Sequence, residues 1–120
     1  MSEFTEFLHE VFELAGPITI RRMFDGHTLY FDGLPVGIVY DDTLYLKADA
    51  ETRPAFEALQ LPQFTYRKKD KTIALPYFQA PDFILEDRQE AALWLRKAFG
   101  ASMRNKPKKR PAKKLTKITR

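Results

Sequence analysis

The apolar residues near the start of the chain recur with the period of a helix. They fall at Phe4, Phe7, Leu8, Val11, Phe12, Leu14 and Ala15, with glutamates between them. Ser2 is suited to cap the start of such a helix, and Gly16-Pro17 is suited to end it. The pattern predicts an amphipathic helix from about residue 4 to residue 15.

From Ile18 onward the period changes to two, which is typical of strands with one buried face. Three pairs of turn-forming residues separate the runs: Asp25-Gly26, Asp32-Gly33 and Asp41-Asp42. The predicted strands are residues 18–24, 27–32, 35–40 and 43–48. Because such short connections join antiparallel neighbours, the four runs predict a meander.

Alternation along these strands assigns an inward and an outward set of side chains. The expected inward pairs are Leu29 with Phe31, Val36 with Ile38, and Leu44 with Leu46. The residues expected to look outward are Tyr30, Tyr45 and Lys47.

A second, short helix is predicted over residues 49–59, with Asp49 or Thr52 as its cap. Pro54 favours the later start, because proline is tolerated only where its missing N–H has no helical partner. Phe56 and Leu59 are expected to point inward.

A hairpin is predicted from residues 64–69 and 72–78, with Asp70-Lys71 at its turn. Phe64 and Tyr66 alternate against Ile73, Leu75 and Tyr77. Proline cannot donate a ladder hydrogen bond, so Pro76 is expected to place the second strand at a sheet edge or in a bulge.

The last helix is predicted to begin at Asp87, which forms a capping box with Glu90, and to run through Phe99 before Gly100. Its core-facing residues are Ala91, Trp94, Leu95 and Ala98. The whole order predicts an α+β domain over residues 1–103. It has an antiparallel sheet of about six strands, a meander plus a hairpin, with N-terminal, middle and C-terminal helices packed on one face.

The charge of the chain divides sharply between this domain and the segment after it. Residues 104–120, the basic tail, contain nine Lys or Arg and no acid, whereas residues 1–103 contain eleven bases against sixteen acids. Proline and basic residues replace core residues in the tail, so we expect the tail to be disordered. We expect the acidic domain to repel nucleic acid, unless its charges are segregated by face, and the tail to attract it.

Five segments resemble, in order and spacing, the N-terminal domain of the TfoX/Sxy proteins, bacterial regulators of competence. They are RRMFDG (21–26), LYFDG (29–33), LYLKAD (44–49), TRPAFEA (52–58) and FTYRKKDKTIALPYFQAP (64–81). The resemblance implies helices packed against an antiparallel sheet. It also implies a coactivator role in transcription, with a cyclic-AMP-receptor-type transcription factor as partner. We expect a stand-alone domain of this type, followed by the basic tail.

Several chemistries are disfavoured by the residues present. The chain has no cysteine, and it contains no nucleophile elbow, P-loop or dinucleotide-binding motif. His9 and Glu13 lie one helical turn apart, but a solvated acidic face is the favoured interpretation over a metal site. We therefore expect no enzyme activity, no cofactor and no metal. No segment resembles a leader or a membrane span, which favours a cytoplasmic location.

The turn after the first strand is the candidate partner-binding surface. Arg22, Phe24 and Asp25 are expected to cluster beside Tyr30. The competing interpretation is structural, because adjacent arginines in a strand point to opposite faces and an inward one needs a partner. Loss of stability without loss of binding in Arg22→Ala would favour that second interpretation.

Two basic segments are candidates for contact with nucleic acid. In the hairpin, Tyr66, Arg67, Lys68, Lys69, Lys71, Tyr77 and Phe78 could stack bases and pair with phosphates, although aromatics in a core and lysines that protect a sheet edge are favoured. In the tail, the nine candidates are Arg104, Lys106, Lys108, Lys109, Arg110, Lys113, Lys114, Lys117 and Arg120. Their contact with DNA or RNA would be nonspecific and salt-sensitive, and a solubilising tail is the equal alternative.

These observations together favour a noncatalytic regulatory or adaptor protein that docks on a protein partner while its tail contacts nucleic acid. Uncovered sheet edges can pair with another chain, so a homodimer is an open alternative. The alternative is a small-molecule-binding domain or enzyme that uses a concavity between sheet and helices, lined by Arg22, Tyr30 and Tyr45.

Overall fold

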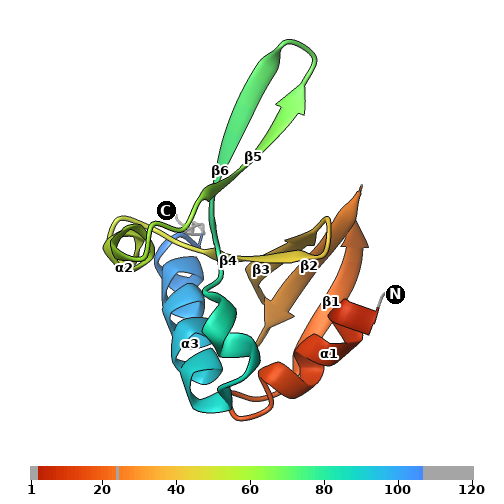
Figure 1. Cartoon of the computed structure of the whole chain (residues 1–120), viewed down its shortest axis with the longest axis vertical. Helices are drawn as coiled ribbons and strands as arrows, with labels where there is room; N and C mark the ends of the chain where they lie inside the picture. Colours follow the sequence, from red (N-terminus) through yellow and green to blue (C-terminus); the bar gives the residue numbers. More distant parts are fainter. Residues whose placement is uncertain (1–2, 24, 107–120) are drawn as a thin grey trace, which may run out of the picture.

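The computed structural model describes residues 3–23 and 25–106 (Figure 1). The helices are α1 (Glu3–Val11), α2 (Arg53–Ala58), the short 3-10 helix η1 (Asp82–Leu85) and α3 (Arg88–Arg104). The strands are β1 (Ile18–Met23), β2 (Gly26–Phe31), β3 (Leu34–Tyr40), β4 (Thr43–Lys47), β5 (Gln63–Lys68) and β6 (Lys71–Gln79). The Ser2 cap and the part of the tail beyond Lys106 lie outside the described residues.

The strands form one six-stranded antiparallel sheet in the order β1-β2-β3-β4-β6-β5. This arrangement confirms the α+β class and the meander-plus-hairpin architecture. The hairpin joins the meander through β6, where Leu46 pairs with Phe78. Figure 1 shows the remainder of β5 and β6 extending away from the body of the molecule.

The main core lies between one face of the sheet and the helices. Leu8 from α1, Leu29 and Leu46 from the sheet, and Leu95 from α3 are all fully buried. The inward assignments of β2 and β4 are therefore confirmed, because Leu29 and Leu46 are joined there by Phe31 and Leu44. The amphipathic helices at the two ends of the domain close this layer.

Strand β3 departs from simple alternation, and the predicted pairing of Val36 with Ile38 on one face is wrong. Val36 and Val39 belong to the main core, whereas Ile38 packs on the opposite face. The cause is a register shift: Leu29 pairs with Gly37 but Tyr30 pairs with Pro35, so Val36 is an extra residue in the ladder. Such a bulge reverses the facing of the residues around it.

The outer face of the sheet carries a second, smaller hydrophobic cluster. Ile38, Phe64 and Tyr77 are buried there, with Met23, Tyr45, Tyr66 and Leu75 packed against them. Phe64 lies edge-on to Tyr45 with ring centres 4.9 Å apart. Tyr30 and Tyr45 lie on the outer face as expected, but they pack against neighbouring side chains and are not fully exposed to solvent.

Helix α2 begins late, as Pro54 predicts. Its N-cap is Thr52, and Pro54 lies in the first turn. Phe56 is fully buried, but the expectation for Leu59 is wrong, because that side chain is 46% exposed. The helix ends at Ala58, so Leu59 follows it as the C-cap and leaves the buried stripe.

Pro76 lies in an irregular part of β6, which is an interior strand, while the strands at the two edges of the sheet are β1 and β5. The β5–β6 register shifts between Gln63 and Thr65, so extra β6 residues stand opposite Phe64. The Gln63 side-chain amide donates to the Leu75 carbonyl at 2.9 Å, and Ala48 N–H donates to the Pro76 carbonyl at 2.9 Å. The bulge alternative is confirmed and the edge alternative is wrong.

Helix α3 begins as predicted and ends later than predicted. The Asp87 carboxylate accepts from the N–H groups of Gln89 and Glu90. Gly100 does not end the helix, which continues to Arg104 and buries Ala101 and Ser102 on the way. A Cβ at Gly100 would stand 3.2 Å from the Arg104 guanidinium, so the glycine leaves room for that side chain to fold back.

Candidate functional site

The β1–β2 hairpin does not bring Arg22 to Tyr30. Arg22 pairs with His27, on the face that carries Ile20, whereas Tyr30 lies near Tyr77 on the outer face. The neighbouring Arg21 lies over the Tyr30 ring instead, 5.7 Å from its centre. The expected cluster is wrong in this respect because adjacent strand residues point to opposite faces.

Other residues of the predicted partner-binding surface can be placed only in part. Asp25 and both arginines are exposed at the end of the hairpin. Phe24 lies outside the described residues. The Thr28 hydroxyl donates to the Met23 sulfur at 2.8 Å, which ties the two strands together next to the turn. Whether this surface binds a partner stays a prediction.

The acidic face of α1 is used for ion pairing. The Arg88 guanidinium lies 2.6 Å from a Glu13 carboxylate oxygen and 3.9 Å from one of Glu10. Helix α1 ends at Val11, earlier than the predicted residue 15, so Glu10 lies in the helix and Glu13 in the turn after it; the contacts join this end of α1 to the start of α3. Within residues 3–23 and 25–106, no group of three or more His, Asp and Glu side chains is arranged to hold a metal ion.

The backbone conformation of the β3–β4 turn explains why two aspartates occupy positions 41 and 42. Both adopt left-handed conformations, with φ of 53° and 54°, which aspartate tolerates better than most residues. The Asp41 carbonyl also accepts from the Thr43 hydroxyl at 3.2 Å. The pair therefore shapes the β3–β4 turn.

The outer face places a lysine and two tyrosines close together. Burial, together with the smaller effect of the nearby Tyr30, raises the pKa of Tyr77 to about 12. Burial also lowers the pKa of Lys47, whose amino group lies 5.2 Å from the centre of the Tyr77 ring. The Tyr77 phenol is protonated at neutral pH, as an unperturbed tyrosine is.

Two clefts lie elsewhere on the molecule. The larger, of about 400 Å³, lies between α2 and the base of the β5–β6 hairpin, and the smaller, of about 110 Å³, lies between α1 and η1. Asp49, Arg53 and Glu57 line the larger cleft above Pro76 and Phe78. Neither cleft includes Arg22, Tyr30 or Tyr45, the residues expected to line a ligand site.

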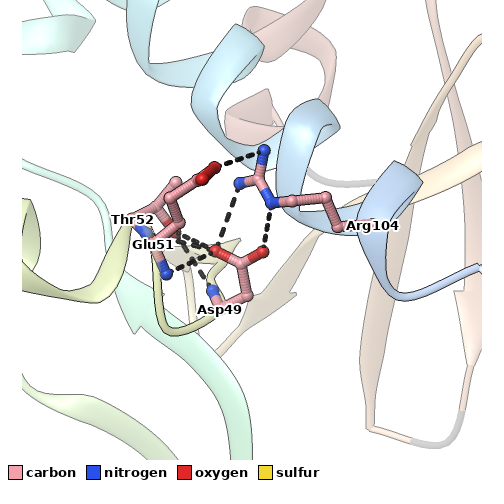
Figure 2. A network of polar contacts seen from close by, with 4 residues as sticks. All are labelled: Asp49, Glu51, Thr52 and Arg104. Atoms are coloured by element: carbon pink, nitrogen blue, oxygen red, sulfur yellow. Dashed lines mark hydrogen bonds and ion pairs between the residues drawn. The ribbon is translucent and has the colours of Figure 1, made fainter.

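A polar network joins the loop before α2 to the end of α3 (Figure 2). Asp49 accepts from the N–H groups of Glu51 and Thr52, each at 3.1 Å. It also accepts from Arg104 Nε at 2.6 Å and from Nη2 at 3.2 Å. Glu51 adds a second ion pair to Arg104 at 2.7 Å.

The charges in this network stabilise one another. A hydrogen bond from Arg104 is the main reason that the pKa of Asp49 falls to about 2, and the Thr52 and Glu51 N–H groups lower it too. The hydrogen bond with Asp49 likewise raises the pKa of Arg104. A carboxylate that receives several donors is held in its charged form.

Arg104 is therefore part of the folded domain, although the sequence assigns it to the tail. Lys106 follows at the exposed end of α3, and the other seven tail candidates lie outside the described residues. The small residues Ala98, Ala101 and Ser102 continue the buried stripe of α3 at helical spacing, and this signal could have extended the helix. The sequence offers no comparable signal for the partnership of Arg104 with Asp49, which are 55 positions apart.

Most of the chain matches a known protein family. The family model described as the TfoX N-terminal domain matches residues 10–102. The chain belongs to the TfoX N-terminal domain family. No curated protein matches the chain.

Family membership confirms the resemblance and supports a regulatory role related to competence. The TfoX match includes Asp49, the last residue of the LYLKAD segment, and it ends just before Arg104. The ion pair thus fastens the residues that follow the matched region onto the TfoX domain. Within the described part of this TfoX chain, no helix has both the length and the apolar composition needed to cross a membrane.

We expect Asp49→Asn to lower the free energy of unfolding by about 1 kcal/mol at pH 7, because the amide keeps an acceptor for the loop but loses the charge that Arg104 pairs with. The Asp49 pKa is lowered in the folded state, so its contribution is present above about pH 4 and is lost as the pH falls toward about 2. Urea unfolding at a series of pH values measures this.

Glu51→Gln is the control for this substitution. It removes the more exposed partner of Arg104 and should cost less. Equal acid sensitivity of wild type and Asp49→Asn between about pH 5 and about pH 2 would contradict a stabilising role for the Asp49 charge.

Proposed function

We propose that this chain is a noncatalytic regulatory adaptor, related to transcription or competence, that docks on a protein partner through its folded domain and contacts nucleic acid through its basic tail. Membership of the TfoX N-terminal domain family carries the regulatory part of this proposal. The partner that the family suggests is a transcription factor of the cyclic-AMP-receptor type.

The distribution of charge supports the nucleic-acid part. Residues 107–120 contain seven Lys or Arg and no acid, whereas residues 1–106 contain thirteen bases against sixteen acids. Binding through phosphates releases counterions, so it strengthens as salt is lowered and reads no base sequence. Sequence preference would come from the protein partner.

The experiment that tests this contact compares the full chain with a chain that ends at Lys106. Ending at Met103 would also remove Arg104 and with it the ion pairs to Asp49 and Glu51. Fluorescence anisotropy with a labelled random-sequence DNA duplex over a salt series gives the affinity of each. We expect the shortened chain to bind more weakly, with a slope of log affinity against log salt smaller by about 0.9 for each phosphate that the tail no longer neutralises.

The control is the melting temperature, which should be the same for both chains. Equal affinity and equal slope would contradict the tail contact. Binding of a protein partner by the folded domain would then be the function to test next, beginning at the β1–β2 turn.

A further inference from the structure

The outer part of the β5–β6 hairpin forms an arm that stands away from the domain (Figure 1). We define the arm as residues 64–75. β6 pairs with β4 only through Tyr77, Phe78 and Gln79, so among the described strands the arm pairs with itself alone. An isolated two-stranded ribbon is marginally stable in water, and this one is anchored at its base by the outer cluster.

The arm carries a charge opposite to that of the body. It contains four bases, Arg67, Lys68, Lys69 and Lys71, and one acid, Asp70. The other residues up to 106 contain nine bases against fifteen acids, a net charge of −6, while the arm has +3. No ion pair within the described residues involves an arm base, and all four are exposed.

This separation of charge orients the domain toward a polyanion. The body repels a phosphate backbone and the arm attracts it, so the arm reaches the polyanion first. Several bases of the body are already paired with carboxylates, as Arg88 and Arg104 are. The arm bases therefore remain available for phosphates.

The register gives the arm two different faces. Thr65 pairs with Ala74 and Arg67 with Thr72, which makes one face of small, exposed side chains around a single arginine. On the other face Tyr66 pairs with Ile73 and Lys68 with Lys71. A ribbon with a small-residue face can approach a surface closely, and the major groove of duplex DNA admits a two-stranded ribbon.

We infer that the arm binds duplex nucleic acid through its phosphates. The small-residue face lies toward the duplex, and the basic side chains at the tip contact the sugar–phosphate backbone. The inference rests on the nucleic-acid contact of the proposed function and adds to it a structured point of attachment on the domain. Base stacking on the hairpin aromatics is not part of it, because Tyr77 and Phe78 are buried and Tyr66 packs against the outer cluster.

The test uses the full chain and the same random-sequence DNA duplex. The variant Arg67→Gln/Lys69→Gln removes two exposed arm bases, and the matched control Arg96→Gln/Lys97→Gln removes two exposed bases from α3. Both change the net charge equally. We expect the arm variant to reduce the slope of log affinity against log salt by up to about two, and the control to reduce it by much less.

The outcomes separate the arm from the tail. If the arm variant and the control bind alike, the effect is one of net charge and the inference is overturned, even where removal of residues 107–120 weakens binding. If the arm variant alone weakens binding while removal of residues 107–120 does not, the inference holds and the tail contact fails. Equal melting temperatures of the two double variants exclude unfolding as the cause.

Discussion

Phe56→Ala is expected to destabilise the domain by about 3–5 kcal/mol, the largest loss that we anticipate from a single truncation. The ring is fully buried between two other aromatic rings. Its centre lies 5.4 Å from that of Phe78, in a stacked arrangement, and 5.1 Å from that of Trp94, edge-on. Its loss leaves a cavity where α2, β6 and α3 meet. Urea unfolding followed by the fluorescence of Trp94, the single tryptophan, measures the change.

Leu59→Ala is the matched control, because it truncates a large apolar side chain at the end of the same helix that is 46% exposed. We expect a change within about 0.5 kcal/mol, as for most surface positions. A cost equal to that of Phe56→Ala would mean that Leu59 is buried in solution and that α2 packs differently against the sheet.

Phe56 also shows which parts of the fold local sequence determines well. Pro54 fixes the start of α2, and the helical spacing from there places Phe56 inward. The same kind of local signal predicts the capping of α3 by Asp87 and the alternation of β2 and β4, and all three are confirmed. Each depends on residues only a few positions apart, so each can be found without knowing the tertiary structure.

Features that depend on where an element is interrupted could not be predicted in this way. Val36 occupies a bulge whose position depends on how β2 pairs with β3. Leu59 leaves the buried stripe because α2 ends one residue earlier. Alternation and helical spacing both assume that an element continues regularly, and they fail where another strand or a chain turn interrupts it.

The candidate sites show the same limit more strongly. Charge and composition locate basic segments, but they do not indicate which bases already have partners. Arg104 pairs with Asp49 and Glu51, whereas Arg67 and Lys69 stand on an arm that composition alone cannot separate from the body. The count of nine tail cations is thus too high by one, because Arg104 belongs to the domain. The net negative charge of the domain also conceals the positive charge of the arm.

The second large effect is expected at the turn that holds the candidate partner surface. Gly26 pairs with Met23 on one side and with Tyr40 on the other, so both of its neighbours are backbone. A Cβ at this position would overlap the carbonyl oxygen of Val39. Because backbone cannot rotate away as a flexible side chain can, we expect Gly26→Ala to push β2 from β3 and to destabilise the domain by about 1–3 kcal/mol or more.

Gly33→Ala separates this steric effect from the general cost of replacing a glycine. Gly33 has a φ of 83°, and a Cβ there would meet nothing within 4 Å, so its replacement costs only the strain of a left-handed backbone, about 1 kcal/mol. Thermal unfolding of the two variants measures the difference. A Gly26→Ala variant as stable as Gly33→Ala would show that the β2–β3 ladder adjusts freely. In that case the β2–β3 pairing would not hold the candidate partner-binding surface in place, and the turn alone would set the positions of Arg22 and Asp25.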